Sequence, residues 1–525
     1  MMRTDVLVIG SGAAGLLLAL HAAEKGLSVT IATKGTIEES NTAWAQGGVA
    51  ASLDLEEDSA AAHLADTLAA GAGLCNEAAA ALVAAEAPTR VEELRELGVA
   101  FNLAVTGELA LTREAAHSHA RTVFSKDATG KAISTTLARK ALHHPKVTVV
   151  ERATAVGLIV DDARCRGAWI FADGELIPIV AAFATALATG GIGQVYERTT
   201  NPPGATGDGL KLAVTAGASL ADVEFVQFHP TALAVAGAPA LLVSEAARGE
   251  GGILINKDGR RFSFDADSRG ELAPRDVVAR AIYREMQRTA AGVWLDLRPI
   301  GSPKHIRTRF PNIAAACARF GIDIGTEPIP VQPAAHYHMG GVLTDLNGRT
   351  TVRGLYAAGE CACTGLHGAN RLAGNSLAEC IVFARRAADD IGGVAPTNGV
   401  VTAADMPDSI HAMQSVEPLR TLMWQAASVV RNGDDLHALQ RKLFEWPDLR
   451  PQPLSRAALE SVALLFAARF ITGAALIREE SRGAHYRIDF PARDDARWRA
   501  RIVWNAGGSN IEQYRVEPIS APVAS

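Results

Sequence analysis

The sequence lacks the features of a nucleic-acid-binding, secreted or membrane-spanning protein. The net charge is −6 and no stretch is rich in lysine and arginine, which argues against a nucleic-acid partner. The chain enters an apolar run almost at once, without the charged segment, apolar core and cleavage site of a signal peptide. Its apolar stretches are interrupted well before about 18 residues, the length that crosses a bilayer. We therefore expect a cytoplasmic protein without a membrane partner.

Cysteine is scarce, and no metal site is apparent. The six cysteines have no regular spacing, which favours reduced thiols over a disulfide framework. Cys361 and Cys363 could form a metal or redox pair, but neither a second cysteine pair nor a histidine ligand accompanies them. His336 and His338 alternate on an expected strand and lack a third ligand. The sequence therefore predicts no bound metal.

The chain has material for several domains. Its 525 residues are 48% hydrophobic and 21% charged, a normal globular balance that predicts two or three domains. Residues 1–50 have a strand–helix–strand pattern, 56–100 are helical, and 147–188 alternate as a hairpin or meander would. The nucleotide-domain pattern resumes at 341–344 and 355–358, and helices are expected at 415–431, 434–446 and 455–476 after a linker near residue 395.

A glycine-rich turn follows the first apolar run. In the sequence G-S-G-A-A-G at 10–15, Gly10 makes the turn, Gly12 lets the backbone approach a pyrophosphate, and Gly15 lets helix and strand pack closely. The phosphates would then meet the free N–H groups of the helix that follows. An ordinary tight turn is the alternative interpretation of this motif alone.

The segment after the second expected strand bears on which dinucleotide binds. That strand ends Ala32-Thr33-Lys34 without an acidic residue, whereas an NAD site usually has Asp or Glu there for the ribose hydroxyl. The glycine-rich stretch 40–48 follows. Its backbone N–H groups could face a large flat ligand, and a surface loop remains the alternative.

Three further motifs complete a resemblance. Ala188-Thr-Gly-Gly, Gly359-Glu360 and Asn375-Ser-Leu, taken with the first glycine-rich turn, resemble the flavoprotein family of fumarate reductases, succinate dehydrogenases and L-aspartate oxidases. The resemblance implies an α/β fold: a Rossmann-like FAD-binding domain with an inserted α+β capping domain and a C-terminal helical domain. The expected boundaries are 1–225 and 338–395 for the FAD-binding domain, 226–337 for the capping domain and 396–525 for the helical domain.

The resemblance also implies FAD as cofactor. A helix N-terminus at Asn375 would stabilise the reduced, anionic flavin. Respiratory members of the family usually attach FAD to a histidine at the position of Asn41, so the flavin here is expected to be bound non-covalently. The residues assigned to FAD are Gly10, Ser11, Gly12, Ala13, Ala14, Gly15, Lys34, Asn41, Thr42, Ala43, Trp44, Ala45, Gln46, Gly47, Gly48, Asp208, Glu360, Ser376 and Leu377.

Several polar patches are out of keeping with a plain core, although each alone could be structural. Together their histidine, arginine and hydroxyl donors suit a ligand with two carboxylates. The resemblance implies that His336 and Arg371 hold one carboxylate while His229 and Ser244 hold the other. Arg275 stands where the family has its proton-transferring arginine. Ser244 replaces the usual threonine and keeps the hydroxyl.

One acidic residue distinguishes an amino acid substrate from fumarate or succinate. Glu114, in Leu111-Thr-Arg-Glu-Ala-Ala, resembles the L-aspartate oxidase residue that contacts the substrate amine, and Arg248 is expected to help orient it. The segment departs from that branch at Ala115 and Ala116, where glycines are common; this change could stiffen the loop. An unpaired buried ammonium would cost several kcal/mol, so a partner such as Glu114 is required.

The resulting hypothesis is oxidation of L-aspartate to iminoaspartate by hydride transfer to FAD. Oxygen or fumarate would accept the electrons, and iminoaspartate would feed quinolinate and NAD biosynthesis, with transient hand-over to quinolinate synthase. A soluble fumarate reductase or succinate dehydrogenase flavoprotein is the alternative enzyme, and it would need an electron partner because this chain has no cluster-binding cysteine spacing. A catalytically idle FAD-binding or scaffold protein is the alternative of another class.

Overall fold

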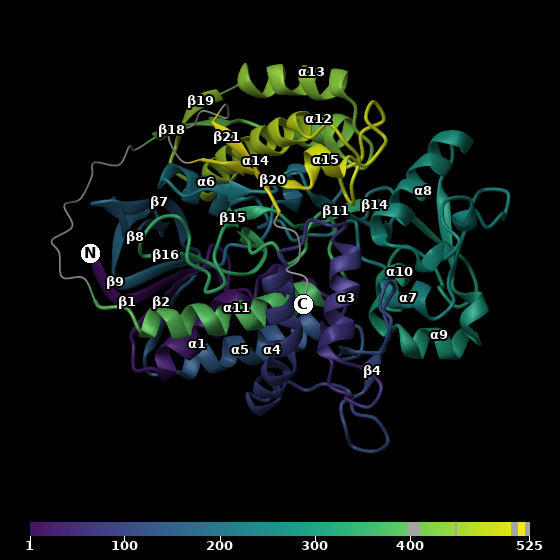
Figure 1. Cartoon of the computed structure of the whole chain (residues 1–525), viewed down its shortest axis with the longest axis horizontal. Coiled ribbons are helices and arrows are strands. Elements are labelled where there is room, and N and C mark those ends of the chain that lie inside the picture. The colour runs from purple at the N-terminus through teal and green to yellow at the C-terminus, as the bar shows by residue number, and fades with distance from the viewer. Residues whose placement is uncertain (397–408, 447–448, 506–512, 520–525) are drawn as a thin grey trace.

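The computed structural model describes residues 1–396, 409–446, 449–505 and 513–519. In Figure 1 the N-terminal part, coloured purple to blue, occupies the lower left and centre. The teal middle of the chain forms a unit at the right, and the yellow C-terminal helices lie along the top. Three groups of elements therefore surround the centre of the molecule.

The N-terminal part is built on a seven-stranded sheet with a parallel core. The strands are, in order, β6 (Val147–Val150), β2 (Val29–Ala32), β1 (Met2–Ile9), β9 (Glu175–Leu187), β8 (Arg164–Ala172) and β7 (Thr154–Asp161), with β16 (Leu355–Ala357) also paired to β9. β1 pairs in parallel with β2 and β9. The apolar run 6–9 is buried on both faces, because helices and other strands cover both sides of a parallel sheet.

The sheet differs in detail from the sequence prediction. Residues Val147–Val150 were expected in the meander, but they pair in parallel with β2. Only β7, β8 and β9 form the antiparallel meander, and the last two predicted runs are one long strand, β9. Each run is short and apolar, so its pattern alone does not reveal its partner.

Helices cover this sheet and bring two distant segments together. α1 (Ala13–Glu24) lies beside α11 (Asn375–Gly392) and α5 (Thr129–His143), as Figure 1 shows. The remaining helices of this part are α2 (Asn41–Trp44), α3 (Ala60–Ala70), α4 (Glu77–Glu96) and α6 (Asp208–Thr215). A small separate sheet has the order β3 (Val49–Ala50), β5 (Thr122–Val123) and β4 (Leu111–Thr112). It brings the end of stretch 40–48 beside the segment that carries Glu114.

An α+β unit is inserted between the strands of the nucleotide domain. Its antiparallel sheet has the order β11 (Val226–Leu233), β14 (Ile329–His338), β13 (Val293–Asp296) and β12 (Ile253–Ile255). Its helices are α7 (Glu245–Gly249), α8 (Arg275–Thr289), α9 (Pro303–Arg309) and α10 (Pro311–Ala318). We propose that this unit is the predicted capping domain, 226–337, between the FAD-binding segments 1–225 and 338–395.

The C-terminal region is mainly helical but also joins a sheet. It contains β18 (Ser409–Met413), α12 (Glu417–Ala427), α13 (Gly433–Phe444), β19 (Leu449–Pro453), α14 (Arg456–Ile477) and α15 (Asp495–Trp498). A five-stranded sheet has the order β17 (Ala362–Cys363), β15 (Gly341–Leu343), β10 (Leu220–Ala221), β20 (Ala500–Trp504) and β21 (Tyr514–Pro518). The expected helices are therefore confirmed, whereas β15 belongs to this sheet and not to the parallel core. The predicted linker lies partly outside the described residues, as does part of the proposed domain 396–525.

Two contacts tie the capping unit to the C-terminal region. Arg280 and Arg284 project from α8, the helix that Arg275 begins. Arg280 donates a hydrogen bond of 2.8 Å to the carbonyl oxygen of Gly483. Arg284 donates one of 2.9 Å to the hydroxyl of Tyr486. The middle of α8 is thereby held against residues 483–486 of the C-terminal region.

Within the described residues, one helix, α14, is long and apolar enough to cross a membrane by length and composition, which the sequence prediction did not anticipate. It has 22 residues, and 67% of its most apolar window is buried inside the protein. α14 packs against α13 and α6. Its surroundings are those of a core helix in a folded domain.

Candidate active site

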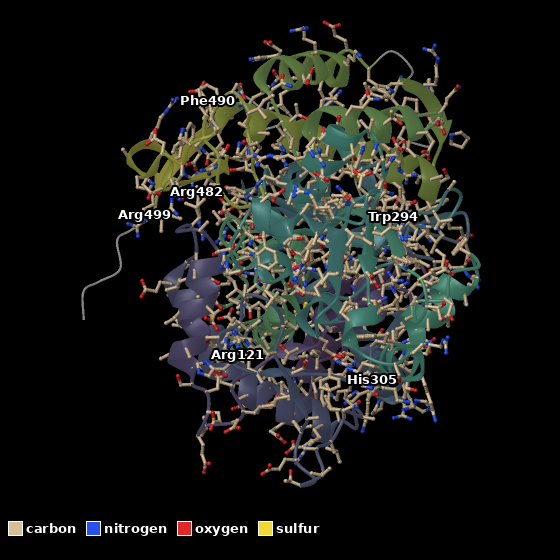
Figure 2. All side chains as sticks on the ribbon, turned by 90° about the vertical axis from the view of Figure 1, so that its right-hand side faces the viewer. Arg121, Trp294, His305, Arg482, Phe490 and Arg499 are labelled. Atoms are coloured by element: carbon tan, nitrogen blue, oxygen red, sulfur yellow. The ribbon has the colours of Figure 1, made fainter. Side chains whose placement is uncertain are left out.

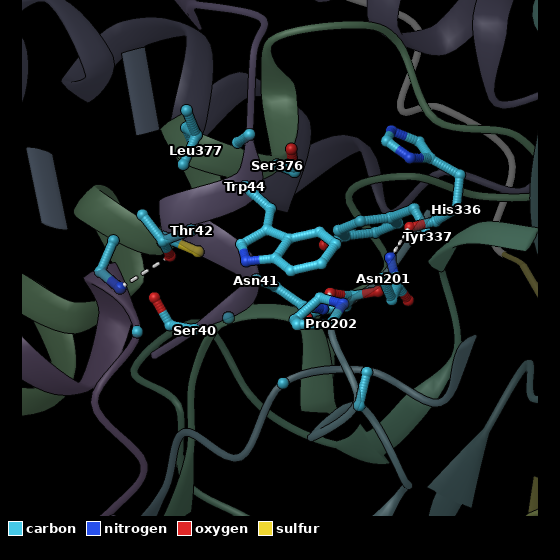
Figure 3. Close-up of a pocket in the computed structure, with 18 of the residues that line it drawn as sticks. Ser40, Asn41, Thr42, Trp44, Asn201, Pro202, His336, Tyr337, Ser376 and Leu377 are labelled. Atoms are coloured by element: carbon cyan, nitrogen blue, oxygen red, sulfur yellow. Dashed lines mark hydrogen bonds between the residues drawn. The ribbon is translucent and has the colours of Figure 1, made fainter. Parts of the chain in front are cut away.

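A cavity of about 510 Å³ lies where the three parts of the molecule meet. Figure 3 shows part of its wall, with Trp44, Tyr337, Ser376 and Leu377 among the labelled lining residues. The predicted site residues that line it are Ser11, Gly12, Ala13, Ala14, Lys34, Asn41, Thr42, Trp44, Ala45, Gln46, Gly47, Gly48, Glu114, His229, Ser244, Arg275, His336, Glu360, Arg371, Ser376 and Leu377. Those outside the lining are Gly10, Gly15, Ala43, Asp208 and Arg248.

The glycine-rich turn forms one end of the cavity. Gly10 has a φ of +114°, and a Cβ atom there would lie 2.1 Å from the carbonyl oxygen of Ala188. A Cβ at Gly15 would lie 2.2 Å from the carbonyl oxygen of Gly10. Gly12 is the N-cap of α1 and has no side chain, and the hydroxyl of Thr42 accepts a hydrogen bond of 3.0 Å from the N–H of Ala13. Two glycines are therefore needed for close packing, and the helix end is available to a phosphate.

The stretch 40–48 folds over the cavity and is not a surface loop. The Asn41 side chain donates to Glu360 Oε2 at 2.7 Å, and the backbone N–H of His338 donates to Glu360 Oε1 at 3.1 Å. Burial raises the pKa of Glu360 to about 7, although these hydrogen bonds oppose the shift. The Trp44 side chain projects among the lining residues (Figure 3) and is 48% exposed.

Asp208 reaches the cavity through a lysine. The Lys34 Nζ donates to Asp208 Oδ2 at 2.5 Å and to the Thr206 hydroxyl at 2.6 Å. It also lies 3.1 Å from Glu460 Oε1. Lys34 lines the cavity while Asp208 stands behind it, so Asp208 fixes a cation at the wall.

A second helix begins at the cavity. Gly374 precedes α11 with a φ of +76°, and no described side chain caps this helix end. A Cβ at Gly374 would lie 2.9 Å from the backbone nitrogen of Ala50. The positive end of α11, with Ser376 and Leu377, therefore faces the cavity. Two helix N-termini that begin after Gly12 and Gly374, with close backbone packing at Gly10 and Gly374, fit the pyrophosphate and flavin of FAD.

Buried charges dominate the other end of the cavity. Arg275 Nε donates to Glu245 Oε2 at 2.5 Å, and its Nη1 donates to Gln227 Oε1 at 3.1 Å. Glu245 Oε1 also lies 3.5 Å from Arg248 Nη2. Burial alone would raise the pKa of Glu245, but Arg275 and Arg248 bring it below its ordinary value. Glu245 therefore stays ionised between two arginines.

Two histidines face each other beside this arginine pair. The rings of His229 and His336 lie 5.1 Å apart. His229 Nδ1 accepts a hydrogen bond of 3.2 Å from the N–H of Thr231, and its Nε2 is buried without a partner among the described residues. Burial and neighbouring arginines lower the pKa of both histidines well below the ordinary value. His229 is therefore neutral with its hydrogen on Nε2, a free donor.

Arg371 completes the set of donors. Its guanidinium stacks on the Tyr337 ring with 4.6 Å to the centroid, and its Nη1 donates to the Ser376 hydroxyl at 2.9 Å. Ser244 caps α7 and accepts from the N–H of Ala246 at 3.3 Å. Arg275 and His336 line the same cavity, as a ligand with two carboxylates requires.

Glu114 is a buried carboxylate among these cations. It is 5% exposed, and its Oε1 accepts a long hydrogen bond of 3.5 Å from the N–H of Gly48. Burial and the nearby Glu245 carboxylate raise its pKa. The expected orientation of Glu114 by Arg248 is not seen in the hydrogen bonds, because Arg248 donates to the carbonyl oxygen of Glu271 at 2.6 Å and pairs with Glu245.

Some lining residues were missed by sequence reasoning. Glu245 directly follows Ser244 in the sequence but was given no role. Tyr337 likewise stood between two candidate histidines. Residues 200–205 and Arg456 line the cavity without any motif that could have indicated it, since they reach the site only through the fold.

Comparison with known proteins agrees with this geometry. The family model described as "FAD binding domain" matches residues 5–377, and the one described as "Fumarate reductase flavoprotein C-term" matches residues 453–523. An L-aspartate oxidase from Nostoc sp. is 45% identical over 93% of this chain and 91% of its own length. One from Mesorhizobium japonicum is 46% identical over 94% and 93%. The chain belongs to the L-aspartate oxidase branch of the fumarate reductase and succinate dehydrogenase flavoprotein family.

Solved structures of this family share the whole fold. The FrdA chain of E. coli quinol fumarate reductase is 30% identical, with a TM-score of 0.92 over 100% of this chain and 98% of its own. The Mycobacterium smegmatis Sdh1 complex contains a chain that is 31% identical, with a TM-score of 0.84 over 99% and 95%. Like other flavoproteins of this family, the chain is an FAD-dependent oxidoreductase.

Proposed function

We propose that this enzyme oxidises L-aspartate to iminoaspartate, with oxygen or fumarate as the final electron acceptor. The single observation that carries the proposal is the shared cavity. At one end it offers two helix N-termini that begin after glycines, and at the other it holds arginine and histidine donors around the buried Glu114 carboxylate. A four-carbon amino dicarboxylic acid matches these charges.

FAD bound in this cradle would accept the hydride from the substrate Cα. The chain's part in cofactor binding is to hold the dinucleotide without a covalent bond, because Asn41 cannot form the attachment that a histidine forms. The uncapped N-terminus of α11 places positive potential at the flavin end.

The substrate carboxylates are held by fixed donors. We assign one carboxylate to His336 and Arg371 and the other to His229 Nε2 and the Ser244 hydroxyl. Arg371 is already positioned by Tyr337, so little side-chain freedom is lost when a ligand binds. Such pre-placed donors orient the Cα–H bond for transfer.

Glu114 and Arg275 have separate tasks in the proposal. Glu114 pairs with the substrate nitrogen, and its raised pKa lets an Oε atom take a proton from the ammonium group. Arg275 lies against Glu245 and transfers a proton at its guanidinium when fumarate is the acceptor. Transfer by a positioned group contributes on the order of 10²–10⁴ in rate.

The product suggests the metabolic setting. Iminoaspartate would supply quinolinate and NAD biosynthesis, and its instability in water would favour transient hand-over to quinolinate synthase. We place the enzyme in the cytoplasm as the expected compartment for this chemistry. L-aspartate and fumarate are the small-molecule partners.

Anaerobic absorbance spectroscopy of the purified FAD-bound enzyme tests the proposal. L-aspartate should bleach the flavin near 450 nm at about stoichiometric amounts, whereas D-aspartate and succinate should not. Bleaching by succinate alone would favour a soluble fumarate reductase or succinate dehydrogenase flavoprotein. No bleaching by any of the three would favour an idle FAD-binding protein.

A further inference from the structure

The segment that carries Glu114 is fastened on the side away from the cavity. Residues 113–121 connect β4 to β5, and Arg121 stands directly before β5. Arg121 is fully buried. Its Nε and Nη2 each donate at 2.8 Å to an oxygen of Asp58, and its Nη1 donates at 2.6 Å to Asp66 Oδ2. Figure 2 labels Arg121 in the lower, N-terminal part of the molecule.

This cation reaches the Glu114 segment through two neighbours. His117 Nδ1 accepts from Arg121 Nη1 at 3.1 Å, so its Nε2 carries the hydrogen and donates to the carbonyl oxygen of Ala373 at 2.9 Å. Ser118 donates to Asp66 from its backbone N–H at 2.8 Å and from its hydroxyl at 2.7 Å. Burial lowers the pKa of His117 to about 4, so it stays neutral.

The backbone between Glu114 and His117 is held in an unusual conformation. Ala116 has a φ of +65°, which disfavours a residue with a Cβ atom. The N–H of His117 donates to the carbonyl oxygen of Glu114 at 3.3 Å, and Arg113 Nε donates to the carbonyl oxygen of His117 at 2.8 Å. Strain of this kind persists only when the surroundings fix it.

The fastening also meets the flavin side of the cavity. Ala373, the acceptor for His117, directly precedes Gly374 at the start of α11. His63 Nε2 contacts Asn375 Oδ1 at 2.8 Å and lies beside His117, with 6.5 Å between the rings. One buried cluster thus contacts both the Glu114 segment and the helix end that faces the flavin.

Resting on the proposed function, we propose that Arg121 is a positioning residue for amine recognition. Arg121, Asp58 and Asp66 do not line the cavity, so they act on the substrate through Glu114. The two carboxylates compensate the buried guanidinium, and Arg121 lowers the pKa of Asp58 to about 2 despite its burial. Loss of the Arg121 guanidinium or of one of its carboxylate partners lets residues 113–121 relax and moves the Glu114 carboxylate away from the substrate nitrogen.

Asp66→Ala is the main test, because Arg121→Met leaves two buried carboxylates uncompensated and could prevent folding. We expect kcat/KM for L-aspartate to fall by about tenfold, since small misplacement of a binding group is costly. The inhibition constant of succinate, which lacks the amine, should change by less than about threefold. Both are measured on the FAD-bound enzyme.

Asp495→Ala is the matched control. Asp495 accepts from the buried Arg482 at 2.8 Å, and Figure 2 labels Arg482 above Arg121. Asp495→Ala should leave unchanged the ratio of kcat/KM for L-aspartate to the inhibition constant of succinate. Asp66→Ala should add no further loss of selectivity to Glu114→Gln, because both would act through the same carboxylate.

Three results would overturn the positioning role: equal losses for L-aspartate and succinate, a change no larger than in the control, or additive losses in the double variant. Failure of the wild-type enzyme to prefer L-aspartate over succinate is a different outcome. It would refute the proposed function itself and not only the role of Arg121.

Discussion

The two ends of the cavity are built from different parts of the chain. The cofactor end depends mainly on backbone: the turn at Gly10 and the starts of α1 and α11 after Gly12 and Gly374. The substrate end is charged side chain: Arg275 and Arg248 enclose Glu245, and Arg371 lies on Tyr337. The first depends on space and the second on charge balance, so different substitutions should damage each end separately.

The largest expected effect is at the substrate end. Arg275→Met removes the proposed proton donor and leaves Glu245 less compensated, so fumarate should reoxidise the reduced enzyme more slowly by about 10²–10⁴-fold. Stopped-flow absorbance measures this rate. Reoxidation by oxygen and FAD content should stay near wild type, and a matching loss of FAD would show that the two ends are not separable.

A single added methyl group should damage the cofactor end. Gly10→Ala combines a positive φ with the 2.1 Å collision against Ala188. We expect it to lower the free energy of unfolding by about 3 kcal/mol or more. Gly98→Ala is the control, because Gly98 also has a positive φ of +98° but a Cβ atom there would meet nothing within 4 Å. This variant should lower the free energy of unfolding by about 1 kcal/mol. Urea unfolding of the FAD-free proteins measures both costs. Equal losses in both variants would contradict the close-packing argument.

Glu114→Gln should separate the substrate from its amine-free analogue. The amide keeps the shape of the carboxylate but not its charge, so kcat/KM for L-aspartate should fall by about 10–100-fold, the worth of a charged hydrogen bond. Competitive inhibition by succinate provides the comparison and should hardly change. Equal weakening of both would remove the basis for assigning the amine to Glu114.

Glu360 should give the FAD-free protein a pH-dependent stability. Its pKa in the folded state is about 7, above the ordinary 4.5, so this contribution is fully present below about pH 4.5 and is lost as the pH rises through about 7. Since Glu360 is only partly buried at the cavity wall, we expect a loss of roughly 1–3 kcal/mol. Urea unfolding at a series of pH values measures it.

Glu360→Gln is the comparison for that pH dependence. The variant cannot ionise, so the fall in the free energy of unfolding between acid and alkaline pH should be smaller by the same amount. Its absolute stability can differ, because the amide loses an acceptor for Asn41 or His338. An unchanged slope would show that folding does not raise the pKa of Glu360.

The smallest effect concerns the strained residue beside Glu114. Ala116→Gly relieves the positive φ of +65° but frees the unfolded chain, so the free energy of unfolding should rise by at most about 1 kcal/mol. Thermal unfolding measures it. A decrease would mean that the Ala116 methyl group contributes packing that outweighs the strain.

The cofactor end could be predicted from the sequence, because its requirements are local. Gly10, Gly12 and Gly15 act within six residues, and their spacing states the geometry. The substrate end was only partly predictable. Glu245 and Arg275 are 30 residues apart and meet only in the fold, and the sequence gives no signal for which buried acid compensates which arginine.

Because the sequence does not reveal which acid pairs with which arginine, Arg248 was assigned a partner other than those it has in the fold, and Arg121 was not predicted to have a role. Arg248 was linked to Glu114 by their shared chemistry, whereas the fold gives it Glu245 and Glu271 as partners. Arg121 carries no motif, and its acceptors Asp58 and Asp66 come from an earlier segment. Predicting such pairs would require knowing the strand order that brings β4 beside β5.

The attachment of α8 to Gly483 and Tyr486 links the C-terminal region to the wall of the cavity. Arg275 lies at the start of that helix. Further along the helix, Arg280 and Arg284 donate hydrogen bonds to Gly483 and Tyr486. An outward movement of the capping unit away from the C-terminal region would have to break these two hydrogen bonds. Tyr486 is thereby linked to the cavity wall through α8, although it lies 211 positions along the chain from Arg275.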